Sequence, residues 1–226
     1  MILKEKLPKE YKRGEVKFLG CKIDLRKRVF IPREETKFWV KKAIKDCRLK
    51  IASCKLKKPK FLDIFSGSGC IGIAILKNIE NSVVDFVDID KKAIEQIKIN
   101  LKLNKIPKKR YKIFLSNLFE KIKNKKYDFI FANPPYVAKE RINEVQKSVL
   151  LYEPKRAIFG GKDGLFWIRR FLTEARDHIK KEGLLFMEFD PLQKEEIEKI
   201  LSKLKFKKFK FFRDQFKKFR FLMVER

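Results

Sequence analysis

The chain has 226 residues, which is long enough for one well-buried domain and too short for two large ones. Hydrophobic residues make up 44% of the chain and aromatic residues 13%, which excludes a disordered basic protein. Lys and Arg number 58 against 29 Asp and Glu, so the formal net charge is +29. This charge indicates either work beside a polyanion, such as RNA or the ribosome, or a drift of composition towards lysine. The spread of the lysines along the whole chain favours drift for most of them.

The cysteines and the single histidine argue against a zinc site. Cys21, Cys47, Cys54 and Cys70 show no C-x-x-C spacing, and His178 is the one histidine. The N-terminus has no apolar segment typical of a signal peptide, and no stretch approaches the length that spans a membrane. We therefore expect a cytoplasmic protein with free thiols, no metal ion and no membrane partner.

The first part of the chain predicts a small hairpin followed by a helix. Two extended segments, 16–19 and 21–31, flank Gly20, where a tight turn is expected. Pro32 ends the second segment, and residues 33–50 have the apolar spacing of a helix.

The rest of the chain alternates between strands and helices. Strands are predicted at residues 61–65, 83–88, 111–115, 127–132 and 183–189, and helices at 70–79, 91–103, 164–180 and 195–204. Residues 133–161 are expected to be irregular, and residues 206–224 to form two strands. The alternation predicts an α/β fold with a parallel sheet, right-handed crossovers and helices on both faces. The last two strands predict an antiparallel hairpin at one edge.

A glycine-rich loop follows the strand at residues 61–65. Its sequence, Asp63-Ile64-Phe65-Ser66-Gly67-Ser68-Gly69, lets the backbone approach a ligand closely, and the next helix begins with unpaired N–H groups. Asp88 ends the next strand about 20–25 residues further on, where a carboxylate can accept both hydroxyls of a ribose. Asp90 is a rival for this role. Asp88 is expected to be solvated at the strand end, so its loss should affect the fold little.

A second motif, Asn133-Pro134-Pro135-Tyr136, follows the strand at residues 127–132. The two prolines fix φ and remove N–H donors, which predicts a rigid turn at the carboxyl edge of the sheet. Such a turn exposes the Asn133 side-chain carbonyl and nearby backbone carbonyls as acceptors beside an aromatic ring. Two acceptors that hold the N–H groups of an amide or amino nitrogen favour the pyramidal geometry that this poor nucleophile needs to attack a methyl group.

The glycine-rich loop, Asp88 and the N-P-P-Y motif together resemble the methyltransferases that modify amino groups. Residues 30–36 are similar to an I-P-R-x-E-T-E segment and residues 153–165 to an E-P…A-L…G-x-D-G-L segment. Asp214 with Arg220 resembles a closing K-D-x-x-x-x-x-R. This set resembles the bacterial protein-glutamine methyltransferases that modify peptide-chain release factors, and it covers nearly the whole chain.

The resemblance implies a class I S-adenosylmethionine-dependent methyltransferase fold, which is Rossmann-like. This fold has a mostly parallel seven-stranded sheet, a C-terminal antiparallel hairpin and, here, a short N-terminal β-hairpin. Residues 1–50 would form that hairpin and a helix packed on the catalytic domain, which would span residues 51–226. The family's N-terminal helical domain is expected to be missing, which leaves the protein substrate more open than the reaction.

The resemblance also implies roles for individual residues. S-adenosylmethionine would be held by Asp63, Phe65, Ser66, Gly67, Ser68, Gly69, Asp88, Ile89, Asn117, Leu118 and Asn133. The acceptor glutamine, in the Gly-Gly-Gln loop of a release factor, would bind Asn133, Pro134, Pro135 and Tyr136. Catalysis would involve Asn133, Pro134 and Tyr136. Four positions depart from the family. Phe65 replaces the first glycine of G-x-G-x-G, and Asn117 stands where an aspartate is common. Glu35 replaces a proline within the I-P-R segment, and Lys37 replaces the glutamate that follows.

Three other functions compete with this one. A sister family with a similar loop and N-P-P-Y motif methylates a glutamine of a large-subunit ribosomal protein. The charge favours an RNA or DNA amino-group methyltransferase, but the sequence shows no dedicated RNA-binding domain or base-reading insertion. A non-enzymatic RNA-binding protein on a decayed methyltransferase fold predicts damage to Asp88 or to N-P-P-Y, and both are intact.

Overall fold

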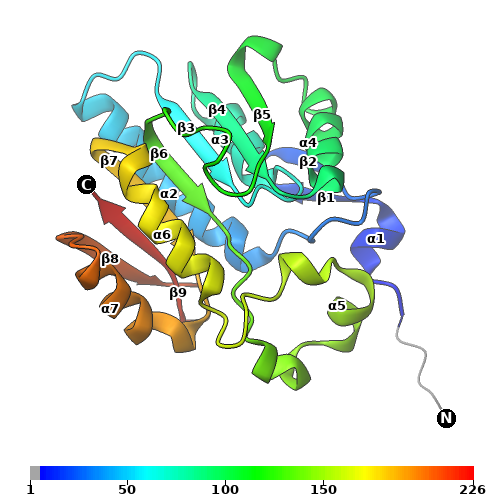
Figure 1. The fold of residues 1–226 in the computed structure, drawn as a ribbon. Helices are drawn as coiled ribbons and strands as arrows, with labels where there is room; N and C mark the ends of the chain where they lie inside the picture. The colour runs from blue at the N-terminus through cyan, green and yellow to red at the C-terminus, as the bar shows by residue number, and fades with distance from the viewer. Residues whose placement is uncertain (1–5) are drawn as a thin grey trace.

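The computed structural model describes residues 6–226 and is built around one large sheet (Figure 1). The strands are β1 (Glu15–Phe18), β2 (Cys21–Asp24), β3 (Lys60–Ile64), β4 (Val83–Asp88), β5 (Tyr111–Leu115), β6 (Tyr127–Ala132), β7 (Ile179–Glu188), β8 (Lys208–Arg213) and β9 (Phe219–Glu225). The α-helices are α1 (Lys9–Arg13), α2 (Glu34–Ser53), α3 (Cys70–Asn78), α4 (Lys91–Leu103), α5 (Lys147–Tyr152), α6 (Phe166–His178) and α7 (Lys194–Lys203).

The large sheet has seven strands in the order β5-β4-β3-β6-β7-β9-β8. Neighbouring strands from β5 to β7 are parallel, whereas β9 runs antiparallel to both β7 and β8. β1 and β2 form a separate antiparallel pair. The predicted fold class is therefore confirmed, including the antiparallel hairpin at the C-terminal edge and the small hairpin near the N-terminus.

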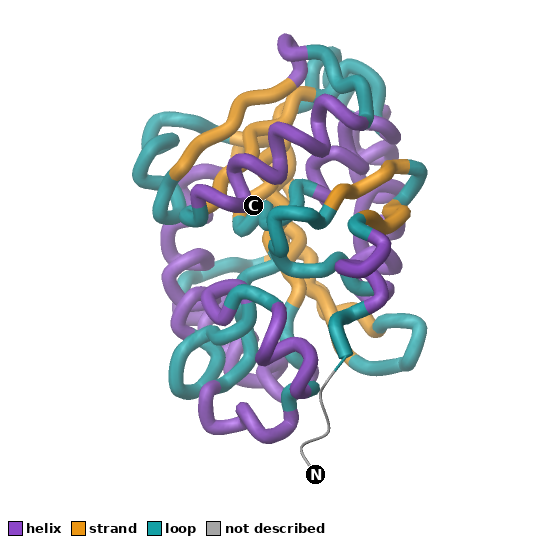
Figure 2. The backbone as a smooth tube through the Cα atoms, turned by 90° about the vertical axis from the view of Figure 1, so that its right-hand side faces the viewer, coloured by secondary structure: helices purple, strands orange, loops and turns teal. Residues whose placement is uncertain are grey.

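Helices cover both faces of the sheet (Figure 2). Alternate side chains of the central strands therefore enter two different apolar layers. α2, α3 and α4 pack with the β1–β2 pair on one face, where Phe61 and Phe129 stack with their ring centroids 4.6 Å apart. α6 and α7 pack on the other face, against Leu62 and Ile130. The continuous apolar character of these strands follows from burial on both sides.

The sequence predicted an extended segment from residue 21 to residue 31, but the strand β2 ends at Asp24. Its partner β1 begins at Glu15, which pairs with Asp24, so the ladder stops there. The Asp24 carboxylate then accepts the backbone N–H of Arg26 at 3.0 Å and turns the chain. The prediction of a longer strand was wrong because the apolar pattern continued past the end of the partner strand.

Residues 133–161 are partly helical, which corrects the expectation of an irregular stretch. They contain η2 (Lys139–Glu144) and η3 (Lys155–Ala157), two short 3₁₀ segments, on either side of α5. These three helices have six residues or fewer and bury no side chain fully. The sequence therefore carries no apolar periodicity that would reveal them.

The parallel strands bring the predicted motifs to one edge of the sheet. The glycine-rich loop follows β3, Asp88 ends β4, and Asn133 follows β6. β3 lies between β4 and β6, so the chain leaves the sheet towards opposite sides at this point. Open α/β sheets bind their ligands in the crevice that such a switch point creates.

Candidate active site

A cavity of about 1130 Å³ opens at this edge of the sheet. One wall comes from the glycine-rich loop and the end of β4, and another from the N-P-P-Y turn. The η2–η3 region and the segment before α2 complete it. All the site residues predicted from the sequence line the cavity except Asp63 and Gly69. A cavity of this size, mostly apolar with a few polar groups, is typical of a small-molecule site.

Asp63 and Gly69 lie behind the loop and shape it. Asp63 is fully buried, and its Oδ2 atom accepts the backbone N–H of Gly72 at 2.9 Å. Among residues 6–226 its Oδ1 atom has no hydrogen-bond partner, and burial raises the pKa of this carboxyl well above its usual value. Gly69 has φ +77°, and a Cβ there would lie 3.1 Å from Ile97. Glycine therefore lets α3 begin close against α4.

The loop itself is fastened to β4 and faces the cavity. The Ser66 hydroxyl donates to the Asp63 carbonyl at 2.7 Å and accepts the backbone N–H of Val87 at 3.0 Å. A Cβ on Gly67 would meet nothing within 4 Å, so the backbone there borders open space. Phe65 has φ +62°, a left-handed conformation that costs a non-glycine residue about 1–2 kcal/mol. Its ring packs edge-on against Trp167 and Phe171, which offsets that cost.

Asp88 supports the loop as well as bordering the cavity, which corrects the expectation of a solvated carboxylate. Its Oδ2 atom accepts the Gly67 N–H at 2.8 Å, and its Oδ1 atom accepts the Asp90 N–H at 2.8 Å. Burial raises the pKa of Asp88 to about 6. The rival Asp90 also lines the cavity, but its carboxylate caps α4 by accepting the Lys92 N–H at 2.9 Å. Both carboxylates therefore border the cavity, and each also accepts backbone N–H groups.

Ile89, Asn117 and Leu118 complete this end of the cavity. Leu118 is buried, and Ile89 is 48% exposed, so both present apolar surface to the space above the loop. The Asn117 amide donates to the Glu120 carboxylate at 2.7 Å, which holds the side chain in place. A carboxylate beside apolar side chains suits a nucleoside, because it offers an acceptor to the ribose and a dry surface to the base.

The N-P-P-Y turn leaves β6 and is braced from two sides. The Asn133 Nδ2 atom lies 3.4 Å from the Thr36 hydroxyl, and the Tyr136 hydroxyl donates to Glu188 at 2.9 Å. Pro134 and Pro135 are buried between these two contacts. The turn is thus held by side-chain contacts at both ends, and the two prolines fix φ between them.

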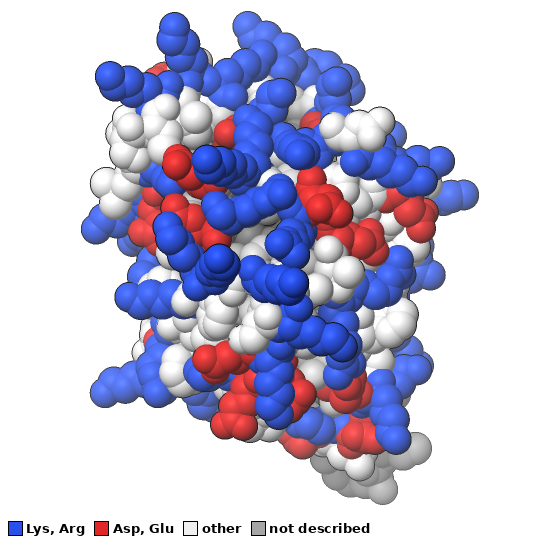
Figure 3. All heavy atoms as spheres, turned by 60° about the vertical axis from the view of Figure 1, so that its left-hand side comes forward, with Lys and Arg blue, Asp and Glu red and all other residues white. Residues whose placement is uncertain are grey.

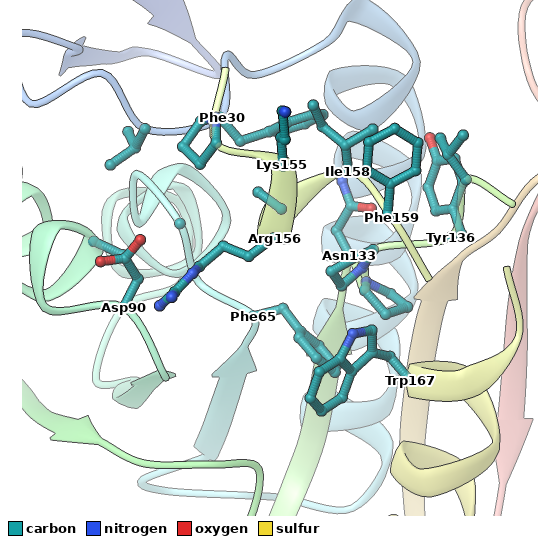
Figure 4. A pocket seen from close by; sticks show the side chains of 18 of the residues that line it. Phe30, Phe65, Asp90, Asn133, Tyr136, Lys155, Arg156, Ile158, Phe159 and Trp167 are labelled. Atoms are coloured by element: carbon teal, nitrogen blue, oxygen red, sulfur yellow. The ribbon is translucent and has the colours of Figure 1, made fainter. Parts of the chain in front are cut away.

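The structure adds functional candidates that the sequence did not single out. Further side chains reach the cavity around Asn133 (Figure 4), namely Phe30, Arg156, Phe159 and Trp167. Glu188 lies behind the wall at the end of β7 and is 1% exposed. The sequence pattern that could have indicated Glu188 is the one that indicated Asp88, because each is an acidic residue at the end of a buried strand.

Two segments that are far apart in the sequence meet beside the cavity. Glu153, from the E-P segment, has a buried side chain that accepts the Ile31 N–H at 3.0 Å and pairs with the Arg33 guanidinium at 2.5 Å. Near the C-terminus, Asp214 pairs with Arg220 at 3.0 Å. Each of these ion pairs joins residues of the motif-like segments noted in the sequence.

The described residues, 6–226, contain no group of three or more His, Cys, Asp or Glu side chains arranged to hold a metal ion. Over the same range, the helices are too short or too polar to cross a membrane. Cys21, Cys47, Cys54 and Cys70 are all free thiols.

Comparison with known proteins adds independent findings. A family model described as the methyltransferase small domain matches residues 48–162. The chain is 35% identical over 207 residues to a release factor glutamine methyltransferase of Flavobacterium psychrophilum, which covers 91% of this chain and 70% of that relative. It is also 35% identical over 200 residues to a release factor glutamine methyltransferase of Fusobacterium nucleatum, which covers 88% of this chain and 54% of that relative.

A solved structure with the same fold is the T. thermophilus 16S rRNA N2 methyltransferase in complex with AdoMet and guanosine. It matches with a TM-score of 0.65 over 94% of this chain and 49% of that chain, at 16% identity. This match shows that the fold is that of class I methyltransferases, and the identity to the relatives above is what shows the family. The chain belongs to the release factor glutamine methyltransferase family.

Proposed function

We propose that the protein binds S-adenosylmethionine and methylates the side-chain amide nitrogen of a glutamine, in the Gly-Gly-Gln loop of a peptide-chain release factor. The family supports the reaction and the kind of substrate. The observation that carries the proposal is the position of Asn133, which lies in the wall of the same cavity as Gly67 and Asp88. A methyl donor and an amide that bind in one cavity can be brought together there for reaction. We place the reaction in the cytoplasm, which the four free thiols support.

The residues around the glycine-rich loop fit the nucleoside part of S-adenosylmethionine. Gly67 leaves room for a ligand against the backbone, and the Asp88 carboxylate is an acceptor for the ribose hydroxyls. Ile89 and Leu118 offer apolar surface to the adenine ring. When bound, the cofactor supplies a methyl group on a cationic sulfur, which makes that carbon open to attack by a nitrogen lone pair.

Asn133 orients the substrate amide and does not act as a base. A carboxamide has no useful basicity near neutral pH, so its contribution comes from the carbonyl oxygen as a hydrogen-bond acceptor. This oxygen and the backbone carbonyls of the turn accept the N–H groups of the glutamine amide, which frees the nitrogen lone pair from conjugation. Once methylated, the nitrogen is cationic and strongly acidic, so it releases its proton to solvent without a dedicated base.

The far end of the cavity suits a protein loop. The η2–α5 region adds apolar side chains to the cavity wall, namely Ile142, Val145 and Val149. Lys155 and Arg156 also line the cavity and are exposed. The two glycines of a Gly-Gly-Gln loop have no side chains, so the loop can bring its glutamine amide close to Asn133.

Asn133→Ala tests the proposal. We expect turnover on a release factor to fall about a hundredfold, the size of effect seen when one preorganised polar group is removed, with a much smaller change in cofactor affinity. Labelled cofactor and mass spectrometry of the Gly-Gly-Gln peptide measure the transfer. Asn124→Ala, in an exposed turn, is the matched control and should keep full activity. Near wild-type turnover in Asn133→Ala contradicts the role of Asn133, and a wild-type protein that labels no glutamine contradicts the substrate.

A further inference from the structure

A buried carboxylate behind the cavity wall connects the two ends of the N-P-P-Y turn. Glu188 accepts three hydrogen bonds from side chains. Its Oε2 atom accepts the Thr36 hydroxyl at 2.7 Å and the Trp39 indole N–H at 2.6 Å. Its Oε1 atom accepts the Tyr136 hydroxyl at 2.9 Å. Thr36 and Tyr136 line the cavity, so Glu188 holds two residues of the wall without bordering the cavity itself.

The Thr36 hydroxyl connects Glu188 to Asn133 by hydrogen bonds. A threonine hydroxyl has one proton, and here it is donated to Glu188, so Thr36 can only accept from its other neighbours. The Asn133 Nδ2 atom is 3.4 Å from the Thr36 oxygen. An asparagine amide can turn by 180° and exchange its donor for its acceptor. Because the Thr36 oxygen can only accept, it favours the orientation in which the Asn133 NH₂ group faces Thr36 and the Asn133 carbonyl oxygen points away from Thr36.

Trp39 fixes the orientation of Glu188 in turn. Its indole is buried and stacks with Phe131 and Phe221, at centroid distances of 5.9 and 5.7 Å. An indole N–H can only donate, so the Glu188 oxygen that it meets must be an acceptor. The Thr36 hydroxyl shares this same oxygen. The orientation of the Asn133 amide is therefore determined by Glu188, which is two hydrogen bonds away through Thr36.

We propose that Glu188 is a positioning residue for the methyl transfer, which acts through Thr36 to turn the Asn133 carbonyl oxygen towards the substrate amide. This inference rests on the proposed function, because it supplies the acceptor that the glutamine N–H groups require. In the reversed orientation, the NH₂ group of Asn133 would face the NH₂ group of the substrate, and two donors would oppose each other. Through Tyr136, the same carboxylate also holds the other end of the turn.

Thr36→Val tests the hydrogen-bond chain, because it keeps the shape of the side chain and removes the hydroxyl. We expect kcat for glutamine methylation to fall roughly tenfold, as for the loss of one hydrogen bond, with little change in KM or in cofactor affinity. Thr36→Ser keeps the hydroxyl and should restore kcat. Equal activity of Thr36→Val and the wild type, while Asn133→Ala shows its expected loss of turnover, overturns the inference and leaves the proposed function intact.

Glu188→Gln separates the two arms of the network. Trp39 can only donate, so the new amide must keep its oxygen towards Trp39 and Thr36. Its NH₂ group then faces Tyr136, whose hydroxyl can turn and accept. The chain to Asn133 survives, and we expect a smaller loss of kcat than in Thr36→Val. A larger loss than in Thr36→Val overturns the inference, since Glu188 would then act through its charge or through Tyr136.

Spectroscopy checks the chain without any substrate. The side-chain amide signals of Asn133 in ¹H–¹⁵N spectra are assigned by their loss in Asn133→Ala. We expect these signals to shift in Thr36→Val and to stay in place in Thr36→Ser. Unchanged signals in Thr36→Val overturn the inference. Shifted signals in a protein that methylates no release factor support it and count against the proposed function alone.

Discussion

At the scale of single residues, the position along a strand separates two carboxylates that look alike in the sequence. Asp63 lies one residue before the end of β3, and its side chain is buried against the start of α3. Asp88 is the last residue of β4 and borders the cavity. Asp63 pairs in register with Phe86, two residues before Asp88, so both carboxylates point to the same face of the sheet. The distance from the strand end therefore decides whether the carboxylate is covered by α3 or reaches the edge.

The raised pKa of Asp88 predicts that cofactor affinity depends on pH. The carboxylate accepts ribose hydroxyls in its ionised form, and its pKa in the free protein is about 6. Affinity should therefore be full above this pKa and should fall as the pH drops through it, by up to about tenfold per pH unit below it. Calorimetry with S-adenosylhomocysteine between about pH 5 and pH 7 measures this effect. Asp88→Asn should bind weakly with little pH dependence, and a flat profile in the wild type would disprove the role of Asp88.

At the scale of elements, the N-P-P-Y turn rests on a segment of glycines before α6. Gly164 has φ +78°, and a Cβ there would lie 2.3 Å from the Tyr136 carbonyl oxygen. A Cβ on Gly160 would lie 2.5 Å from the Pro135 carbonyl oxygen. The turn and this segment also share a backbone hydrogen bond, from the Val137 N–H to the Ile158 carbonyl at 3.0 Å. The two chains can approach this closely only because the glycines lack side chains.

Gly164→Ala should therefore lower the stability of the protein more than an alanine substitution at a left-handed glycine that has open space around it. We expect it to lower the free energy of unfolding by about 1–3 kcal/mol beyond the backbone strain, because the new methyl group overpacks the turn. Glutamine methylation should fall with it. Gly14→Ala is the matched control, since Gly14 has φ +76° but its Cβ would lie 3.5 Å from Arg26. Denaturant unfolding of both variants measures the difference, and equal losses would show that the turn tolerates displacement.

The division into residues 1–50 and a catalytic domain from residue 51 stays a prediction. α2 continues to Ser53, and Trp39 on this helix stacks on Phe131 of β6 and Phe221 of β9. The β1–β2 pair belongs to the same apolar layer as α3. The N-terminal elements thus share their core with the sheet, because a short hairpin cannot bury enough apolar surface alone.

At the scale of the whole molecule, the positive charge is spread over the surface. Figure 3 shows Lys and Arg side chains over most of one face, with Asp and Glu between them. Several lysines also lie over aromatic rings, as Lys42 does at 4.3 Å from the Phe212 ring centroid. A surface of this kind attracts polyanions through its net charge of +29 without selecting a sequence.

We therefore expect any binding to RNA to be electrostatic. The affinity for an unstructured RNA should fall steeply between about 50 and 200 mM salt, with a steep linear slope of log affinity against log salt. Filter binding over this range measures the slope. A shallow slope with persistent binding would reveal non-electrostatic contacts and would favour a nucleic-acid substrate.

The sequence by itself determined the order of strands and helices, the fold class and the two motifs of the site. Burial periodicity and turn chemistry are local, so β4, β5, β6 and α4 have the bounds that were predicted. Only the tertiary structure decided which polar groups meet behind the motifs. Glu188 reaches Thr36 across 152 positions of the chain, and Glu153 reaches Arg33 across 120. Such pairs depend on how α2 packs against the end of β7 and the segment after α5, and local sequence patterns do not determine that packing.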